Sequence, residues 1–333
     1  MSSQGPSRTP IPLVIYRDLR VGMVVILVML FVAVIMEQFP ATCWQTAISS
    51  YYYTSAHNIF TASLMALGTL FIVYRGSSDT EDVLLTLAGV CAFIAAMVPQ
   101  LPRPRMCWPA GDLPEEYKVD PAMMLNVKAL VFALGLGWIA MRLVQCLRGK
   151  TREPRTAVSM VVSRFVFWPI MAVGLIALFF FPDTFKALAH GAAGVLMLSA
   201  FIATAFCTAY IVGREDALLS KHRRGYQLWY WGIASVMLVT LGFVVGLHLI
   251  QPSWAQTIWG LRIEAVLIFE FAAYWVVQTF ELWNTPDRTE LLAPATREQT
   301  EYVLTLRKAL CDLAKAWRNG RGKKGGGKFW PFM

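Results

Sequence analysis

Three histidines and one glutamate in this sequence are of the residue types that bind divalent metal ions. They are His57, His190, His248 and Glu264, and each falls near the end of a predicted apolar segment that faces the outer side of the membrane. Neutral imidazole and carboxylate groups are common ligands of zinc and similar ions. The histidines come from separate segments and form no HxxxH or HxxE pair. A zinc or similar divalent-metal site at His57, His190 and His248 is therefore one hypothesis, and ordinary interhelical hydrogen bonding is the other.

Further polar residues fall at the same level of the predicted membrane. Asn58 follows His57 directly, Lys128 lies near the start of its own apolar segment, and Arg262 precedes Glu264 by two positions. A cationic side chain at this depth could hold an anionic headgroup. Ionisable residues inside a membrane usually face a protein interior or a cavity. We therefore predict one polar binding site in the outer half of the molecule, formed by His57, Asn58, Lys128, His190, His248, Arg262 and Glu264.

The last apolar segment carries a second polar pattern. Glu270 lies near its middle, and Tyr274, Gln278 and Glu281 follow at i+4, i+8 and i+11. In a helix this spacing places all four side chains on one face. An isolated ionised Glu in the middle of a bilayer costs several kcal/mol, so Glu270 is either protonated or partnered. The pattern predicts a proton or cation path, or a packing face around a neutral Glu270.

The composition shows what must position these residues. The chain has 333 residues, of which 56% are hydrophobic and 15% charged, and its mean hydropathy is +0.51. Soluble domains carry about 25% charged residues. Soluble enzymes, disordered scaffolds and small disulfide-rich domains are therefore excluded. The net charge of +9 does not indicate nucleic-acid binding, because no recognition motif accompanies it.

Eight apolar segments are long enough to cross a bilayer. About 20 residues of helix span about 30 Å of hydrocarbon, and lipid requires each segment to satisfy its own backbone hydrogen bonds. The sequence therefore predicts an all-α polytopic bundle of eight transmembrane helices. The predicted spans are Val21–Met36, Ser55–Tyr74, Val83–Val98, Met123–Leu147, Met160–Phe181, Phe185–Val212, Gln227–Ile250 and Gln256–Trp283.

The distribution of lysine and arginine predicts the orientation. With eight spans, 24 of the 30 basic residues fall on the side that holds both termini. Basic residues collect on the cytoplasmic side of membrane proteins. We expect both termini in the cytoplasm, with residues 1–20 as an N-terminal segment, 21–283 as the transmembrane domain and 284–333 as a cytoplasmic tail.

The tail and the outer loops carry further predictions. A helix over about residues 297–318 would place Val303, Leu306, Leu310, Leu313 and Trp317 on one seam. This helix either lies on the inner leaflet or pairs with a helical protein partner. The basic residues around it favour anionic inner-leaflet lipids. Cys43 and Cys107 both fall on the outer side, where a disulfide between them is plausible.

No sequence motif points to catalysis. The chain has no GxSxG, Walker loop, GxGxxG or HExxH. The leading hypothesis is a non-enzymatic membrane protein that binds or translocates a small solute, an ion or a lipid. One alternative is a metal-dependent lipid hydrolase with the three histidines as ligands. Another is an accessory subunit of a membrane complex that docks through the tail helix.

About half of the chain resembles a family of uncharacterised bacterial multipass integral-membrane proteins. The resemblance lies in the tyrosine-rich start of the second span, in an AG…P pattern on the third and in an EAV…W pattern on the last. It implies a bacterial plasma (inner) membrane and eight spans, and it brings no activity with it. The residues that carry it are Ser50–Thr54, His57, Asn58, Leu87–Gly89, Val98, Pro99 and Glu264–Trp275. A second comparison is with seven-span hydrolases related to alkaline ceramidases, whose HxxxH pair is missing here.

Overall fold

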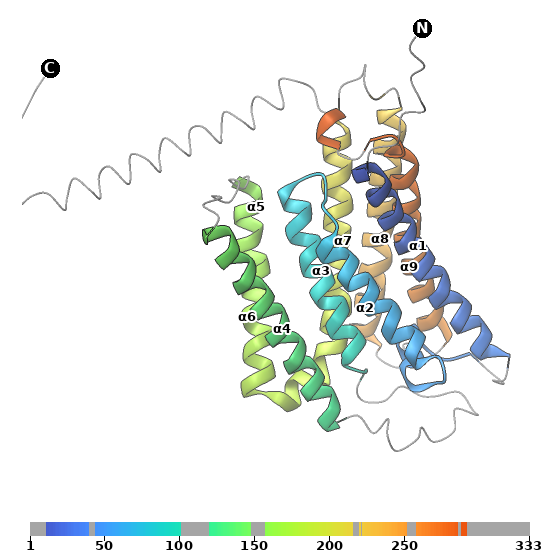
Figure 1. Cartoon of the computed structure of the whole chain (residues 1–333). Helices are drawn as coiled ribbons and strands as arrows, with labels where there is room; N and C mark the ends of the chain where they lie inside the picture. Colours follow the sequence, from blue (N-terminus) through green and yellow to red (C-terminus); the bar gives the residue numbers. More distant parts are fainter. Residues whose placement is uncertain are drawn as a thin grey trace, which may run out of the picture.

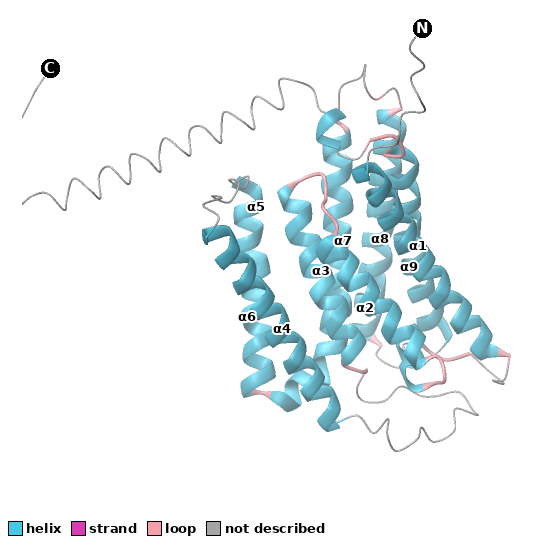
Figure 2. Ribbon diagram, viewed as in Figure 1, coloured by secondary structure: helices cyan, strands magenta, loops and turns pink. Residues whose placement is uncertain are grey.

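The computed structural model describes residues 11–39, 44–100, 120–147, 157–215, 220, 222–251, 258–285 and 288–291. Within these ranges the regular structure is helical and there is no strand (Figures 1 and 2). The all-α prediction is therefore confirmed for this part of the chain. The helices are α1 (Ile11–Gln38), α2 (His57–Val73), α3 (Asp79–Met97), α4 (Asp120–Leu147), α5 (Ala157–Val162), α6 (Trp168–Phe180), α7 (Pro182–Val212), α8 (Arg223–Ile250) and α9 (Ile258–Glu281). Three short helical elements, η1 (Ile48–Tyr53), η3 (Ser163–Phe167) and η5 (Arg288–Leu291), complete the set.

Six of the helices form a closed ring. Going round it, α1 packs on α2, α2 on α3, α3 on α7, α7 on α8, α8 on α9, and α9 returns to α1. Helices α4, α5 and α6 lie outside this ring, against α3 and α7, at the left of Figure 1. We call the end of the ring where α1 begins and α9 ends the arginine end, after Arg17, Arg20 and Arg288. The opposite end, which holds η1, is the tyrosine end.

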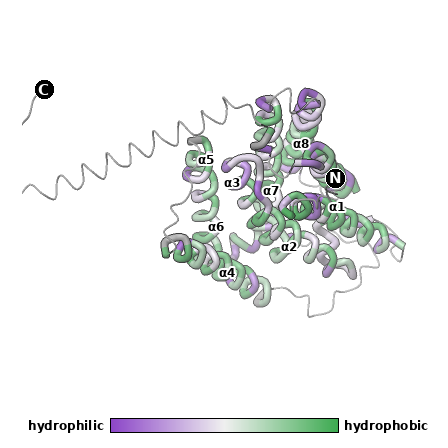
Figure 3. Tube along the Cα trace, turned by 45° about the horizontal axis from the view of Figure 1, so that its top comes forward, coloured by the Kyte–Doolittle hydropathy of each residue, from purple (hydrophilic) through white to green (hydrophobic). Residues whose placement is uncertain are grey.

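The chain is a multipass membrane protein. Among the described residues, six helical stretches are long and apolar enough to cross a membrane: α1, α3, Ala122–Val144 in α4, Val158–Phe180 through α5 and α6, α7, and α8. Large apolar side chains are exposed on these stretches except α3, and Figure 3 shows hydrophobic residues along most of α1 and α4. Of the two remaining predicted spans, α2 has 17 residues, and α9 carries four charged residues.

The first helix begins earlier than predicted. We expected the span to start at Val21, and α1 starts at Ile11. Its additional turns bring two arginines to the end of α9, whose last carbonyl groups have no partner within their own helix. Arg17 Nε donates to the carbonyl of Trp283, and Arg20 Nη1 donates to that of Leu282 at 3.2 Å. These two contacts close the ring between its first and last helices.

Two local features follow directly from single residues. Ser78 caps α3 by accepting a hydrogen bond from the backbone N–H of Glu81, and the acidic first turn suits the positive end of the helix dipole.

The predicted span Met160–Phe181 is one rod from α5 to α6, interrupted by a π-helical turn at Ser163–Phe167. Pro169 follows this turn and has no N–H for the carbonyl of Phe165, which explains the local widening of the helix.

Helices α2 and α3 come into close backbone contact at two glycines. A Cβ on Gly89 of α3 would lie 2.6 Å from the carbonyl oxygen of Gly68 in α2, and a Cβ on Gly68 would lie 2.9 Å from that of Gly89. Only a residue without a side chain permits backbones to approach this closely. This crossing holds α3 at the depth where its first turn joins the polar network described below.

Aromatic side chains fill the centre of the ring. Phe71 of α2, Phe201 of α7, and Phe271 and Trp275 of α9 are all buried, with ring centroids between 4.3 and 6.3 Å apart. Such contacts between rings of different helices are favourable beyond the burial of their area. Toward the tyrosine end, the buried tyrosines of η1 pack on α1 and α2. The arginine end, in contrast, is filled by polar groups.

Candidate functional site

The three histidines predicted to share a site have separate environments. The Nδ1 atom of His57 lies 2.6 Å from the carbonyl oxygen of Tyr52, and the two rings meet edge to face. The Nδ1 atom of His190 lies 2.7 Å from the carbonyl oxygen of Val98 at the end of α3. His248 lies on the exposed surface of α8. Among the described residues, no three His, Cys, Asp or Glu side chains are grouped so that they could hold a metal ion.

The other residues predicted for the outer site are also dispersed. Glu264 accepts a hydrogen bond of 2.6 Å from the backbone N–H of Ile48 and so fixes the start of η1. Arg262 is exposed, with its guanidinium 4.8 Å from the centre of the Trp259 ring. Asn58 is exposed and Lys128 half-buried. Cys43, Cys107 and the predicted tail helix 297–318 lie outside the described residues.

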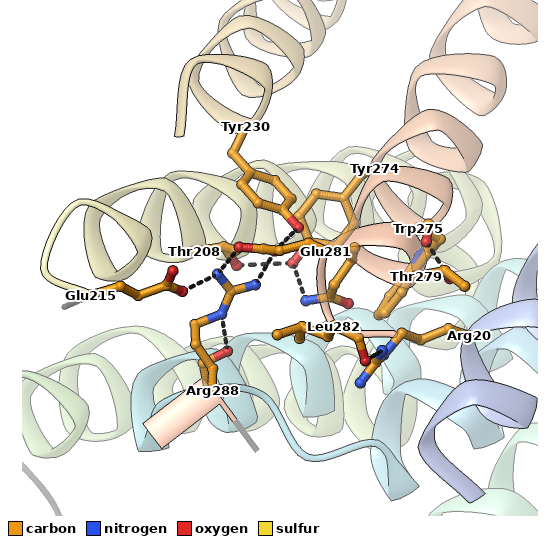
Figure 4. A network of polar contacts seen from close by, with 12 residues as sticks. Arg20, Thr208, Glu215, Tyr230, Tyr274, Trp275, Thr279, Glu281, Leu282 and Arg288 are labelled. Carbon is orange, nitrogen blue, oxygen red and sulfur yellow. Dashed lines mark hydrogen bonds and ion pairs between the residues drawn. The ribbon is translucent and has the colours of Figure 1, made fainter. Parts of the chain in front are cut away.

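The polar face predicted on α9 divides into two parts. Glu270 accepts a hydrogen bond of 3.1 Å from the hydroxyl of Thr240 in α8. Tyr274, Gln278 and Glu281 lie nearer the arginine end, where they join a buried network that includes every helix of the ring. This network is the candidate functional site (Figure 4).

Arg288 lies at the centre of one branch of the network. Its Nη1 and Nη2 atoms bind the two carboxylate oxygens of Glu281 at 2.7 and 2.6 Å, and Nη1 also binds Glu215 at 3.0 Å. Its Nε donates to the hydroxyl of Ser77 at 3.0 Å, and its guanidinium carbon lies 5.6 Å from the centre of the Tyr230 ring. Tyr230 in turn donates its hydroxyl hydrogen to Glu281. We call Ser77, Glu215, Tyr230 and Glu281 the Arg288 seat.

A second branch begins at Arg20 of α1, which is fully buried. Arg20 Nε donates to the hydroxyl oxygen of Tyr74 at 3.1 Å, and Tyr74 donates to the Oε1 atom of Gln278 at 3.1 Å. Gln278 Nε2 donates to the hydroxyl oxygen of Tyr274 at 3.3 Å. The branch therefore runs across the ring from α1, through the end of α2, to α9.

This branch ends at Glu81 in the first turn of α3. The hydroxyl of Tyr274 lies 2.9 Å from that of Thr208 in α7, and Thr208 Oγ1 lies 2.9 Å from Glu81 Oε1. Because the Tyr274 oxygen already accepts from Gln278, its own hydrogen is available to Thr208, and the Thr208 hydrogen is available to Glu81. Every donor between Arg20 and Glu81 then points toward the carboxylate. Hydrogen bonds aligned in this way polarise one another.

Among the described residues of the network, three fully buried carboxyl groups face two fully buried guanidinium groups, and the partly buried Arg223 donates only to the backbone carbonyl of Glu215. Glu81, Glu215 and Glu281 are opposed by Arg20 and Arg288, and all five side chains are removed from water. Arg288 binds Glu215 and Glu281, whereas Glu81 accepts from Thr208 and from the backbone N–H of Ser77. Within the described residues, Glu81 is therefore the carboxyl of the network that is not bonded to a guanidinium group.

The charges at the seat shift one another's proton affinities. Burial by itself would lower the pKa of Arg288, but the Glu281 carboxylate outweighs this effect and raises that pKa well above its usual value. Burial raises the pKa of Glu215, and the positive charge of Arg288 opposes the rise. Arg288 therefore stays charged.

Sequence reasoning found the three α9 residues of the network, Tyr274, Gln278 and Glu281, and missed their partners on the other helices. Arg288 falls in the predicted cytoplasmic tail and Glu81 lies two residues before the predicted span Val83–Val98, and charged residues beside a membrane are usually solvated. The available signal was the polar face on α9, which requires polar partners on neighbouring helices. The residues missed are Arg20, Tyr74, Ser77, Glu81, Thr208, Glu215, Tyr230 and Arg288.

Comparison of the chain with protein-family models, with curated proteins and with solved structures finds no match.

Proposed function

We propose that this protein is a membrane transport protein that binds and releases a proton at Glu81 as part of moving a small solute or ion. Ionisable side chains are costly within a membrane and mark transport pathways and proton relays when they occur there. The polar binding site predicted in the outer half is replaced in this proposal by the network at the arginine end. The membrane character of the chain and the buried network are the observations on which the proposal rests.

The single observation that carries the proposal is the bonding of Glu81. It is the carboxyl in excess, it is 1% exposed, and its Oε1 oxygen lies 2.9 Å from a hydroxyl that has another acceptor. Thr208 can donate its one hydrogen either to Glu81 or to the carbonyl oxygen of Thr204 at 3.1 Å. When Glu81 is ionised, Thr208 donates to it. When Glu81 takes up a proton, Glu81 donates to Thr208, and Thr208 turns to the Thr204 carbonyl.

The network also offers a reason for coupling between helices. A proton on Glu81 reverses the direction of the last hydrogen bond in the branch that begins at Arg20. Protonation therefore changes the hydrogen bonding of a chain that links α1, α2, α7 and α9. A two-state element whose equilibrium depends on protonation is what proton-coupled transport requires. The Tyr274 hydroxyl and the Gln278 amide transmit this change without being charged themselves.

We further propose eight transmembrane helices with both termini in the cytoplasm of a bacterium. Helices α2 and α9 pack in the ring between candidate spans, which supports their being spans as well. The contact of Arg17 with Trp283 requires the start of α1 and the end of α9 to lie on one side. The excess of basic residues on that side supports a cytoplasmic location. The inner membrane itself rests on the family resemblance.

The experiment is an infrared titration of the purified protein in lipid. Glu81→Gln should remove one carboxyl band that appears on acidification, and Asp183→Asn, which alters a 97% exposed carboxylate, should leave that band in place. In proteoliposomes containing a pH-sensitive dye, Glu81→Gln should lower proton flux at least tenfold, and Asp183→Asn should not. A Glu81→Gln protein with the wild-type titration contradicts the proposal.

The described residues do not favour the lipid hydrolase, because they contain no metal-ligand cluster. The accessory-subunit hypothesis depends on the tail helix and is a prediction to be tested by removing residues 297–318.

A further inference from the structure

We propose that the Arg288 seat is a binding site for a guanidinium cation, and that Arg288 occupies it as a built-in substitute for that ligand. This inference deepens the proposed function, since it names a guanidinium compound as the solute. It rests on the membrane-transport proposal but not on the proton at Glu81. The evidence is the position of the seat residues on the helices of the ring and the chemistry of their side chains.

The seat is built by the bundle and not by the segment that fills it. Ser77 lies in the turn between α2 and α3, Glu215 just beyond α7, Tyr230 in α8 and Glu281 at the end of α9. Contacts independent of Arg288 hold these residues: Tyr230 donates to Glu281, and Arg223 donates to the backbone carbonyl of Glu215. Arg288 itself belongs to η5, an element of only four residues. The seat is therefore preorganised, and its occupant is attached to the ring by a short segment.

The chemistry of the seat selects a planar cation with several N–H donors. Glu281 binds two N–H groups of the guanidinium at 2.7 and 2.6 Å, in the paired geometry that matches guanidinium to carboxylate. Glu215 and Ser77 accept from the same group, and the Tyr230 ring lies at 5.6 Å, within cation–π distance. Two carboxylates around one cation exclude anionic ligands. A single ammonium group has three N–H donors, fewer than the four acceptor oxygens that Ser77, Glu215 and Glu281 present.

The seat is connected to the proton site through one residue. The Ser77 hydroxyl accepts from Arg288, and the Ser77 backbone N–H donates to Glu81. Departure or arrival of a cation therefore changes the hydrogen bonding of the carboxylate that we propose to be protonated. This connection is the physical basis for exchanging a guanidinium ion against a proton.

The test uses the full chain with Arg288→Ala and ethylguanidinium as the probe. Ethylguanidinium should raise the unfolding temperature of this variant in a saturable way, by at least about 2 °C. Urea has a similar planar shape but no charge, and it should give no such rise. The Glu281→Gln/Arg288→Ala double variant should not respond. Arg75→Ala, which removes an ion pair whose arginine is 71% exposed, should not respond either.

A second arm uses the wild-type protein. Proteoliposomes loaded with unlabelled guanidinium should accumulate radiolabelled guanidinium by exchange, and Glu281→Gln should reduce this accumulation at least tenfold. If Arg288→Ala is recovered only when ethylguanidinium is present during purification, the inference is supported. No saturable response in Arg288→Ala, an equal response to urea, or failure to recover the variant even with the probe present overturns it. A carboxyl band that persists in Glu81→Gln contradicts the proton proposal alone, and a missing response to ethylguanidinium contradicts the guanidinium proposal alone. The two failures are therefore distinguishable.

Discussion

Replacing Thr208 by valine removes one hydroxyl from the middle of the network and leaves the size of the side chain nearly unchanged. Thr208 is fully buried, and its hydroxyl lies 2.9 Å from both Glu81 Oε1 and the Tyr274 hydroxyl. Thr204 lies one turn earlier on α7 and is 1% exposed. Among the described residues its hydroxyl donates to the carbonyl of Ala200 at 3.0 Å. Thr204→Val is therefore a matched control for Thr208→Val.

The expected cost depends on the charge of Glu81. A hydrogen bond to a charged group contributes about 1.5–3 kcal/mol, and a buried hydroxyl left without an acceptor costs about 1–3 kcal/mol. Interhelical hydrogen bonds between neutral groups in membrane proteins average only about 0.6 kcal/mol. With Glu81 ionised, Thr208→Val should lower the free energy of unfolding by about 3 kcal/mol. With Glu81 protonated, the bond to a charged group is absent but the Tyr274 hydroxyl still loses its acceptor, so Thr208→Val should lower the free energy of unfolding by about 1–2 kcal/mol. In Thr204→Val the loss should be below about 1 kcal/mol at any pH.

The measurement is unfolding by a denaturing detergent in mixed micelles, followed by helical circular dichroism, at alkaline and at mildly acidic pH. A double-mutant cycle of Thr208→Val with Glu81→Gln should give a coupling of about 1–2 kcal/mol at alkaline pH. Equal losses for Thr208→Val and Thr204→Val at both pH values would refute the assignment of Glu81 as the ionisable end of the branch.

Three further predictions concern the contacts that hold the ring together. Gly89→Ala should lower the free energy of unfolding by about 1–3 kcal/mol, because the new Cβ would lie 2.6 Å from the carbonyl oxygen of Gly68. Gly242→Ala is its control: a Cβ there has no other atom within 4 Å, and the variant should raise the free energy of unfolding by up to about 1 kcal/mol through helix propensity. Arg288→Met should cost about 3–5 kcal/mol by leaving buried carboxylates unpaired, against about 0–1 kcal/mol for the exposed Arg75→Met. Both pairs are compared by detergent unfolding. Burial raises the pKa of Glu215 above its ordinary 4.5, so the contribution of Glu215 to the free energy of unfolding is full below about pH 4.5 and declines as pH rises through the raised pKa. A Glu215→Gln protein unfolded across the same pH range should lack this decline. An unchanged decline would contradict the raised pKa of Glu215.

The spans were predictable because lipid imposes a minimum apolar length. The predicted Met123–Leu147 and Phe185–Val212 each end at the residue where the helix ends and begin within three residues of its start. The largest error is the start of α1, because the predicted N-terminal segment 1–20 contains Arg17 and Arg20, which lie in the helix. They extend the helix instead, and their side chains donate to the carbonyl oxygens of Trp283 and Leu282 just after α9. Nothing in the sequence indicates which helix end lies beside α1.

The site was predictable only where several residues of one helix share a face. The spacing of Tyr274, Gln278 and Glu281 fixed their common direction, and all three lie in the network. The histidines were grouped by depth alone, which says nothing about direction around a helix. His57 and His190 bind the backbone of neighbouring segments and His248 is exposed. Depth is therefore a much weaker predictor of proximity than helical spacing.

Under the guanidinium proposal, Arg288 has to leave its seat before a guanidinium ion can bind there. Its departure leaves Glu215 and Glu281 buried without their cation, which costs about 3–5 kcal/mol. Water entering the seat, protons on the two carboxylates, or a guanidinium ion bound in place of Arg288 would each reduce that cost. The guanidinium ion alone restores the paired contacts at 2.6 and 2.7 Å that hold the seat in its present geometry. If the seat exchanges Arg288 for a guanidinium ion beside a carboxyl that carries a proton, as we propose, the two movements are coupled through Ser77.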